Sequence, residues 1–179
     1  GAFWQQMGLP LNDLYDELLM FAGFATVGDV MDLTGENRIL VREGLKCLQK
    51  TTHPGMSALI EANELARDTL SAFHIGFVLG PCINASGRLA TAKRALALLD
   101  TKDQALAIER AAELKELNDE RKELTEQGLA QAVDLIEHSD LMEDRVLVVY
   151  LPNCLESLAG IIAGRIRERY YRPVFVLTR

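Results

Sequence analysis

Apolar residues recur at helical spacing over most of the chain. This spacing predicts helices over residues 13–24 and 36–48, a third helix whose first turn lies near Pro54, and another helix from Thr91. Over residues 25–33 the helical period is interrupted by a glycine, two acidic residues and β-branched side chains. That segment is therefore predicted to be a loop or a short extended piece between helices.

The pattern changes in the second half of the chain. From Asp103 to about His138 a helical period continues without a proline, which is far longer than the mean helix of about 11 to 12 residues. Its narrow apolar stripe among many charges predicts a helix that spans two bodies, although a long partner in a helical hairpin has the same pattern. Residues 146–151 then form a continuous apolar run typical of a buried strand, followed by a helix over 156–170 and a strand over 174–177.

These last elements form a predicted βαβ unit, so the fold class is α/β overall and helix-rich. A single parallel pair of strands leaves open edges on both sides. We therefore expect the chain to be an internal piece of a longer protein.

The segment Gly80-Pro-Cys-Ile-Asn-Ala-Ser-Gly-Arg88 places turn residues between two helical patterns. We expect an irregular backbone whose free N–H groups could bind an oxyanion. Arg88 would add a planar fork of donors that suits phosphate better than a lysine, and Asn84 and Ser86 could add neutral hydrogen bonds. On these residues alone, a plain Gly-Pro turn with an arginine that pairs with a carboxylate is the commoner explanation.

Composition narrows the range of functions. The chain has 179 residues, 49% of them apolar, and a formal charge of −7, which disfavours a protein that binds nucleic acid over its whole surface but allows a local basic groove. Its three cysteines, Cys47, Cys82 and Cys154, lie too far apart in sequence to suggest a disulfide framework or a zinc site, which suits a reducing cytoplasm. No apolar run of about 18 residues and no signal-peptide pattern is present, so we expect no membrane association.

For three further sets of side chains, the sequence pattern favours a structural role over ligand binding. The histidines stand alone, which favours a structural role over metal binding: His53, His74 and His138. Four aromatic residues lie within apolar patterns and are placed in the core rather than on a base-stacking platform: Phe3, Trp4, Phe73 and Phe77. A run of basic residues is explained by charge pairing with Glu168 on a solvated helix: Arg165, Arg167, Arg169 and Arg172.

Three segments, in this order, resemble the RecJ-type members of the DHH phosphoesterase superfamily. Residues 25–37, Ala-Thr-Val-Gly-Asp-Val-Met-Asp-Leu-Thr-Gly-Glu-Asn, resemble the last metal-binding motif of that family's first domain, with Asp29 at the motif aspartate. The Gly-Pro segment described above resembles the family's signature for binding nucleic-acid phosphate, and Asn84 and Arg88 match it. Residues 151–175 resemble the start of the second, DHHA1-type domain, and the long helix before them resembles the connector between domains.

The resemblance implies a division of the chain into three parts. Residues 1–50 would be the C-terminal part of a DHH catalytic domain. Residues 51–139 would be a helical connector that carries the phosphate-binding loop and the long helix, and residues 140–179 would begin a DHHA1-like domain.

The resemblance also implies a function: metal-dependent 5′ to 3′ exonuclease action on single-stranded DNA in repair and recombination, with Mn²⁺ or Mg²⁺ as cofactor and other DNA-repair proteins as partners. Asp29 would bind metal, whereas Asn84, Ser86 and Arg88 would bind phosphate, with Arg165 as a secondary candidate. The earlier aspartate motifs and the D-H-H motif of the family are absent, so this chain alone is expected to bind but not to cut.

Two alternatives remain open. A DHH phosphodiesterase could act on short oligonucleotides or cyclic dinucleotides instead of long DNA. The chain could also belong to a non-catalytic RecJ-like scaffold in replication, because Cys82, Ala90 and Leu155 depart from the family pattern.

Overall fold

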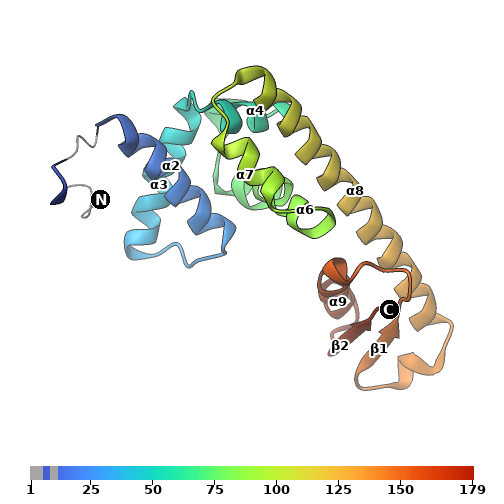
Figure 1. Ribbon diagram of the computed structural model, residues 1–179. Helices are drawn as coiled ribbons and strands as arrows, with labels where there is room; N and C mark the ends of the chain where they lie inside the picture. The colour runs from blue at the N-terminus through green and yellow to red at the C-terminus, as the bar shows by residue number, and fades with distance from the viewer. Residues whose placement is uncertain (1–5, 9–11) are drawn as a thin grey trace.

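The computed structural model describes residues 6–8 and 12–179. It is a helix-rich α/β structure in which a cluster of helices is joined to a small βαβ unit by one long helix, α8 (Figure 1). The elements, in chain order, are α2 (Asn12–Gly28), α3 (Gly35–Lys50), α4 (Pro54–Ala62), η1 (Arg67–Thr69), α5 (Ala72–His74), η2 (Ile75–Leu79), α6 (Gly80–Leu89), α7 (Lys93–Asp100), α8 (Gln104–Glu137), η3 (Asp140–Glu143), β1 (Leu147–Tyr150), α9 (Glu156–Tyr170) and β2 (Val174–Leu177). Among the helices described, none is long and apolar enough to cross a membrane.

Helices α2 and α3 pack closely because two glycines face each other. A Cβ atom added at Gly44 would lie 2.6 Å from the backbone oxygen of Leu19 and 3.0 Å from Cα of Gly23. Only a residue without a side chain allows this approach of the two backbones.

Helix α2 is longer than its sequence pattern predicts, so the expected loop over residues 25–33 is wrong for its first four positions. The hydroxyl of Thr26 donates to the carbonyl of Ala22 at 2.7 Å, which satisfies this polar side chain inside the helix, and Val27 packs against the core. The helix ends after Gly28, and the next turn places Val30 at a positive φ of 56°.

The predicted loop over residues 80–88 is also wrong, because this segment is helical. α5, η2 and α6 follow one another without a break from Ala72 to Leu89, and η2 is a π-helical turn. A proline inside an α-helix lacks one donor and clashes with the carbonyl four residues earlier. Here the wider π turn, closed by the Gly80 N–H donating to the carbonyl of Ile75, ends just before Pro81, which lies in the first turn of α6, where a missing donor is tolerated. A Cβ atom at Gly80 would lie 2.7 Å from the oxygen of Ile75, so glycine is required at this turn.

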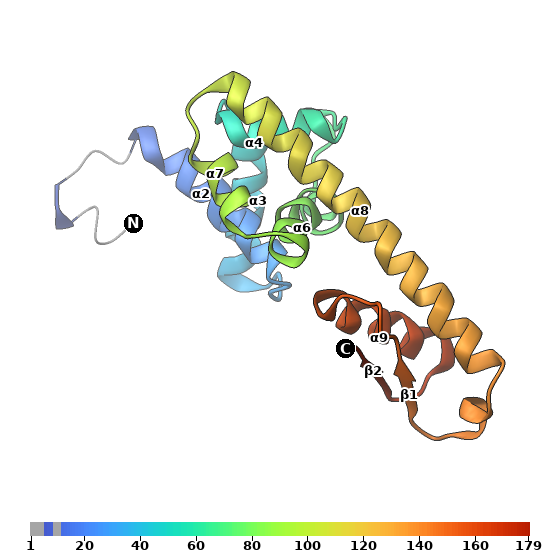
Figure 2. The same ribbon diagram turned by 45° about the vertical axis from the view of Figure 1, so that its right-hand side comes forward.

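The long helix α8 confirms the prediction of a helix that spans two bodies. Its first half contributes Ala107, Ala111 and Leu114 to a core formed with the N-terminal helices, and its second half contributes Ala132 and Ile136 to a second core. Figure 2 shows the rod-like helix running from the helical cluster to the βαβ unit.

The predicted βαβ unit is confirmed, with β1 and β2 parallel and Leu147 paired with Val174. Residues alternate along β1, so that Leu147 and Val149 are buried, whereas Val148 and Tyr150 are exposed. The expectation of a fully buried first strand is therefore wrong, because one face of the sheet packs against the second core and the other face has no covering element among the described residues.

Candidate phosphate-binding site

The continuous helix from Ala72 to Leu89 has one exposed face. Phe73, Phe77, Asn84 and Arg88 are exposed along it, whereas the opposite face is buried in the first core. Within α6, a spacing of about 3.6 residues per turn places Asn84 and Arg88, four positions apart, on this face. The helix, rather than a loop, thus aligns the two main phosphate-binding candidates.

A small pocket lies where this helix meets α8 and α9. It has a volume of about 120 Å³ and is lined by Pro81, Asn84, Arg88, Arg121 and Ile161. Asn84 and Arg88 are one helical turn apart, so the structure brings two of the sequence-predicted residues into one site. The sequence analysis missed Arg121, because the long charged pattern of α8 gives no sign of which of its cations faces α6.

Arg88 links the two halves of the molecule. Its Nη1 donates to the carbonyl of Ser157 at 2.8 Å, and the Ser157 hydroxyl donates to the Arg88 carbonyl at 2.8 Å. These two bonds tie the end of α6 to the start of α9. One hydrogen bond from a guanidinium leaves further donors of its fork for an anion.

Arg121 lies deeper in the pocket. Its Nε donates to Oδ1 of Asn118 at 3.1 Å, and Asn118 is itself buried. Burial, together with repulsion from Arg88 and Arg165, lowers the pKa of Arg121. In the part of the chain that the structure describes, neither Arg88 nor Arg121 has a carboxylate within 4.0 Å, so the pocket carries uncompensated positive charge.

Ser86 lies on the other side of the helix. It is 0% exposed, and its hydroxyl donates to the carbonyl of Ile83 at 2.8 Å. Contact between Ser86 and a phosphate would require the helix to shift, so this role remains a prediction.

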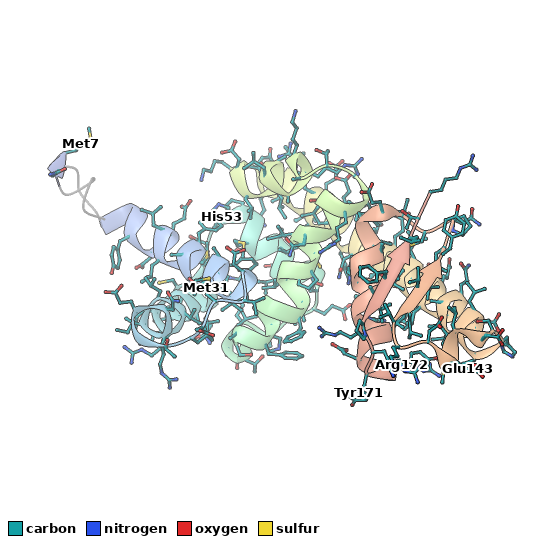
Figure 3. The ribbon with its side chains drawn as sticks, turned by 90° about the horizontal axis from the view of Figure 1, so that it is seen from below. Met7, Met31, His53, Glu143, Tyr171 and Arg172 are labelled. Carbon is teal, nitrogen blue, oxygen red and sulfur yellow. The ribbon has the colours of Figure 1, made fainter. Side chains whose placement is uncertain are left out.

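Two basic residues of α9 pair across to α8, rather than with Glu168 as the sequence suggested. Arg165 forms an ion pair with Glu126, and Arg169 donates to Glu137 at 2.9 Å. Arg172 caps the turn around Glu143 by donating to the carbonyls of Met142 and Asp144, at 2.6 and 2.9 Å (Figure 3). Arg165 does not line the pocket, and Glu126 balances much of its charge.

Asp29 lies on the exposed turn after α2, near the opposite end of the exposed face. It has the hard carboxylate oxygens that Mn²⁺ or Mg²⁺ prefers. However, among the residues described, no three His, Cys, Asp or Glu side chains lie together in a way that could hold a metal ion. The described residues thus do not form a metal site by themselves, and at most Asp29 supplies one ligand.

The aromatic residues near this turn are not in the core, which corrects the sequence-based expectation. Phe73 and Phe77 are 60% and 71% exposed and stack on each other with ring centroids 4.9 Å apart. With Val30 and Met31 they line an apolar hollow of about 500 Å³. Phe3 and Trp4 lie outside the described residues.

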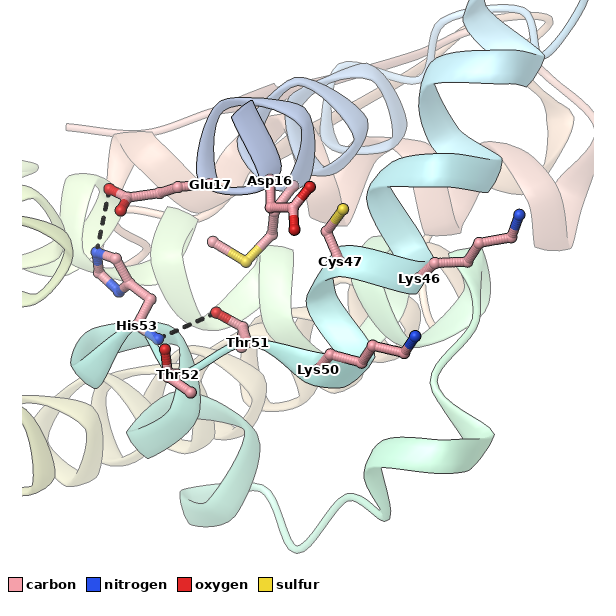
Figure 4. A pocket seen from close by; sticks show the side chains of 9 residues that line it. Asp16, Glu17, Lys46, Cys47, Lys50, Thr51, Thr52 and His53 are labelled. Carbon is pink, nitrogen blue, oxygen red and sulfur yellow. Dashed lines mark hydrogen bonds and ion pairs between the residues drawn. The ribbon is translucent and has the colours of Figure 1, made fainter. Parts of the chain in front are cut away.

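A separate polar pocket surrounds His53 (Figure 4). Nδ1 of His53 accepts the amide N–H of Met56 at 3.3 Å and so caps α4, which agrees with a structural role. The Nε2 atom points toward Glu17 at 3.9 Å without a hydrogen-bond partner among the described residues. Burial lowers the pKa of His53.

The amino-acid sequence is similar to those of known bacterial exonucleases. The chain is 34% identical over 167 residues to the single-stranded-DNA-specific exonuclease RecJ of Bacillus subtilis, 39% identical over 163 residues to that of Salmonella typhimurium, and 36% identical over 178 residues to that of Thermus thermophilus. These matches cover 93%, 88% and 99% of this chain. The chain is homologous to part of RecJ. It spans 21%, 28% and 25% of the length of these three relatives.

Solved RecJ structures agree with this relationship. The Mg²⁺ complex of RecJ from Thermus thermophilus matches with a TM-score of 0.86 and 33% identity, over 99% of this chain and 27% of that one. A RecJ structure bound to manganese matches with a TM-score of 0.82 and 34% identity, over 99% of this chain and 43% of that one. No family model matches the chain. The RecJ structures were thus obtained with the two ions that the sequence resemblance implied.

Proposed function

We propose that this chain forms the phosphate-binding part of a metal-dependent exonuclease that degrades single-stranded DNA from the 5′ end in repair and recombination. The observation that carries the proposal is the pocket that unites Asn84 and Arg88 in a chain homologous to RecJ. Single-stranded DNA offers a regularly spaced row of phosphates, and a guanidinium fork is well matched to them.

In this proposal each residue has a defined task. Arg88 binds a backbone phosphate through its free donors and offsets its charge, while the Asn84 amide donates a neutral hydrogen bond to the same group or to the sugar. Ser86 supports the helix from the core side and approaches phosphate only if the helix shifts. Arg165 contributes less, because Glu126 already balances its charge.

Asp29 would serve as one ligand of a Mn²⁺ or Mg²⁺ site. When bound, such an ion polarises the phosphate and activates water. The chain's own part is to hold the DNA. The exposed face of the helix runs from the turn that carries Asp29 toward Arg88. Along the helix axis, the part of this face from Phe77 to Arg88 is about 16 Å long, at about 1.5 Å per residue. The division into a DHH end at 1–50, a connector at 51–139 and a DHHA1-like start at 140–179 is part of the same proposal.

The proposal predicts that the chain binds single-stranded DNA more tightly than duplex DNA of the same sequence. Replacing Arg88 by Ala should weaken that binding by about 10- to 100-fold, because a charge-assisted hydrogen bond contributes about 1.5–3 kcal/mol. Arg88→Lys should restore only part of the loss, since lysine lacks the fork. Fluorescence anisotropy with a labelled oligothymidylate measures the affinity of the wild type and of both variants.

Arg94→Gln is a matched control, because Arg94 is an exposed arginine paired with Glu113 outside the pocket. Equal affinity of the wild type and the Arg88→Ala variant would contradict the proposal. Competition by a dinucleotide or a cyclic dinucleotide as strongly as by a long strand would instead favour the short-substrate alternative.

A further inference from the structure

We propose that Arg121 is a second phosphate-binding residue and that it shares one backbone phosphate with Arg88 and Asn84. This inference rests on the proposed function for the identity of the ligand as DNA. Its basis is the pocket between α6, α8 and α9, to which Arg121 contributes from the long helix.

The dimensions of the pocket fit a single small anion. Its volume of about 120 Å³ is well below the roughly 300–1,000 Å³ of pockets that enclose drug-sized ligands. A phosphate group is small enough for such a space, and we expect the base and the sugar of the same nucleotide to lie outside it. Pro81 and Ile161 provide apolar walls that strengthen electrostatic attraction inside.

The lack of a carboxylate partner for Arg121 among the described residues also supports an anion-binding role. Three other arginines near α8 have carboxylate partners: Arg94 pairs with Glu113, Arg165 with Glu126 and Arg169 with Glu137. Arg110 donates to the carbonyl of Ala97 instead. Arg121 is instead held by a neutral amide, Asn118, and stands near two further guanidinium groups, those of Arg88 and Arg165.

Arg88 and Arg165 act on Arg121 by repulsion, which disfavours its charged form when no anion is bound. Half-burial of an arginine without a carboxylate adds to this cost. A phosphate would remove both penalties at once. This is the arrangement expected of residues positioned for binding rather than for stability.

The position of Arg121 also has a geometric consequence. Arg88 comes from α6, whereas Arg121 comes from α8, and the Ser157 contacts of Arg88 reach α9. A phosphate held by both guanidinium groups would therefore fasten together the helices that carry the two cores.

The variant Arg121→Gln tests this role with little structural disturbance. Gln Nε2 lies at the same position along the side chain as Arg Nε, so it can still donate to Asn118 while the guanidinium charge is removed. We expect unchanged or higher thermal stability, because repulsion with Arg88 and Arg165 is relieved. We also expect single-stranded DNA affinity to fall by about 10- to 100-fold.

Salt dependence separates a phosphate contact from an indirect effect. For single-stranded nucleic acid, the slope of log K against log salt concentration changes by about 0.7 for each phosphate neutralised. Because the two arginines share one phosphate, the Arg88→Gln, Arg121→Gln double variant should reduce the magnitude of the slope by about that amount, and Arg121→Gln alone should reduce it by less. Arg121→Lys should retain the slope with intermediate affinity. Arg94→Gln, which removes the same charge outside the pocket, should change affinity less than about twofold.

Inorganic phosphate provides a second, independent measurement. Titration of the wild-type chain with phosphate should shift the Arg121 Nε–Hε signal in ¹H–¹⁵N NMR spectra, and the Arg88→Gln variant should weaken that shift. If Arg88→Gln impairs DNA binding but Arg121→Gln binds as the wild type does, this inference is wrong and the proposed function stands.

If the wild-type chain binds no DNA, the proposed function fails. The phosphate titration then decides the inference alone: a shift at Arg121 supports a free-phosphate site, and the absence of a shift overturns it.

Discussion

At the scale of the residue, the buried imidazole ring of His53 caps the start of α4. The ring is 4% exposed, its Nδ1 accepts the N–H of Met56, and Glu17 faces its Nε2. Burial lowers the pKa of His53, Glu17 opposes this shift and Lys102 adds to it. The folded state thus favours the neutral ring, which can act as an acceptor for the cap.

This shift predicts the direction of a pH effect on stability. Because the pKa is lower in the folded state, the contribution of His53 is fully present above the unfolded pKa of about 6.5. It is lost progressively as the pH falls from there through the folded pKa, with a slope of at most about 1.4 kcal/mol per pH unit for one proton. His53→Asn keeps a capping side chain that does not titrate.

Urea unfolding between pH 5 and 8 measures this effect. The free energy of unfolding should fall more steeply with acid for the wild type than for His53→Asn. Parallel curves for the two proteins would show that His53 carries no such linkage.

The sequence pattern around each residue explains why Arg88 was predicted as a site residue and Arg121 was not. Arg88 is recognisable because it stands in a distinctive segment with Gly80 and Pro81. Arg121 stands among many charged residues of α8, where a solvated helix face is the usual explanation. Its meeting with Arg88 depends on how α6 crosses α8.

At the scale of the element, the contact between α2 and α3 depends on Gly23 and Gly44. Gly44→Ala should destabilise the protein by about 1–3 kcal/mol, because its Cβ would lie 2.6 Å from the backbone oxygen of Leu19, which cannot move alone. Gly160→Ala in α9 is the matched control. Nothing lies within 4 Å of its added Cβ, so better helix propensity should stabilise the protein by up to about 1 kcal/mol.

Thermal and urea unfolding of the two variants test this contrast. A Gly44→Ala protein as stable as the wild type would mean that the helices can separate at little cost. Circular dichroism should show the same helix content in both.

The helix from Ala72 to Leu89 shows the limit of local reasoning for an element. Glycine and proline usually mark turns, so Gly80 and Pro81 predicted a loop. The π turn over η2 lets both residues continue the helix instead. As a result, an anion would be bound by side chains aligned on a helix face rather than by a nest of backbone amides.

At the scale of the whole molecule, α8 joins two cores, and its role as a spanning helix followed from its length and narrow apolar stripe. Gly128 does not interrupt it. Its missing side chain makes room for Ile162 of α9, whose Cδ1 would lie 2.6 Å from an added Cβ. The missing side chain of Gly128 therefore allows a close contact between α8 and α9.

The whole chain should bind DNA but release no nucleotides from it. Among the described residues, Asp29 has no neighbouring ligands with which to hold a metal ion. Incubation with Mn²⁺ and 5′-labelled single-stranded DNA should therefore give no mononucleotides, while RecJ from Thermus thermophilus serves as the positive control. Nucleotide release that depends on Asp29 would show that this chain builds a complete metal site.

The sequence by itself determined the helix-rich α/β class, the boundaries of α9 and β2 and the extent of α8, and it predicted Asn84 and Arg88 as phosphate-binding residues. These features depend on local periodicity, capping and residue chemistry, which neighbouring residues encode. Only the tertiary structure decided that residues 80–88 are helical, that Phe73 and Phe77 are exposed and that Arg121 joins Arg88. Those outcomes depend on a π turn and on the crossing of helices distant in sequence, because packing sets which side chains meet.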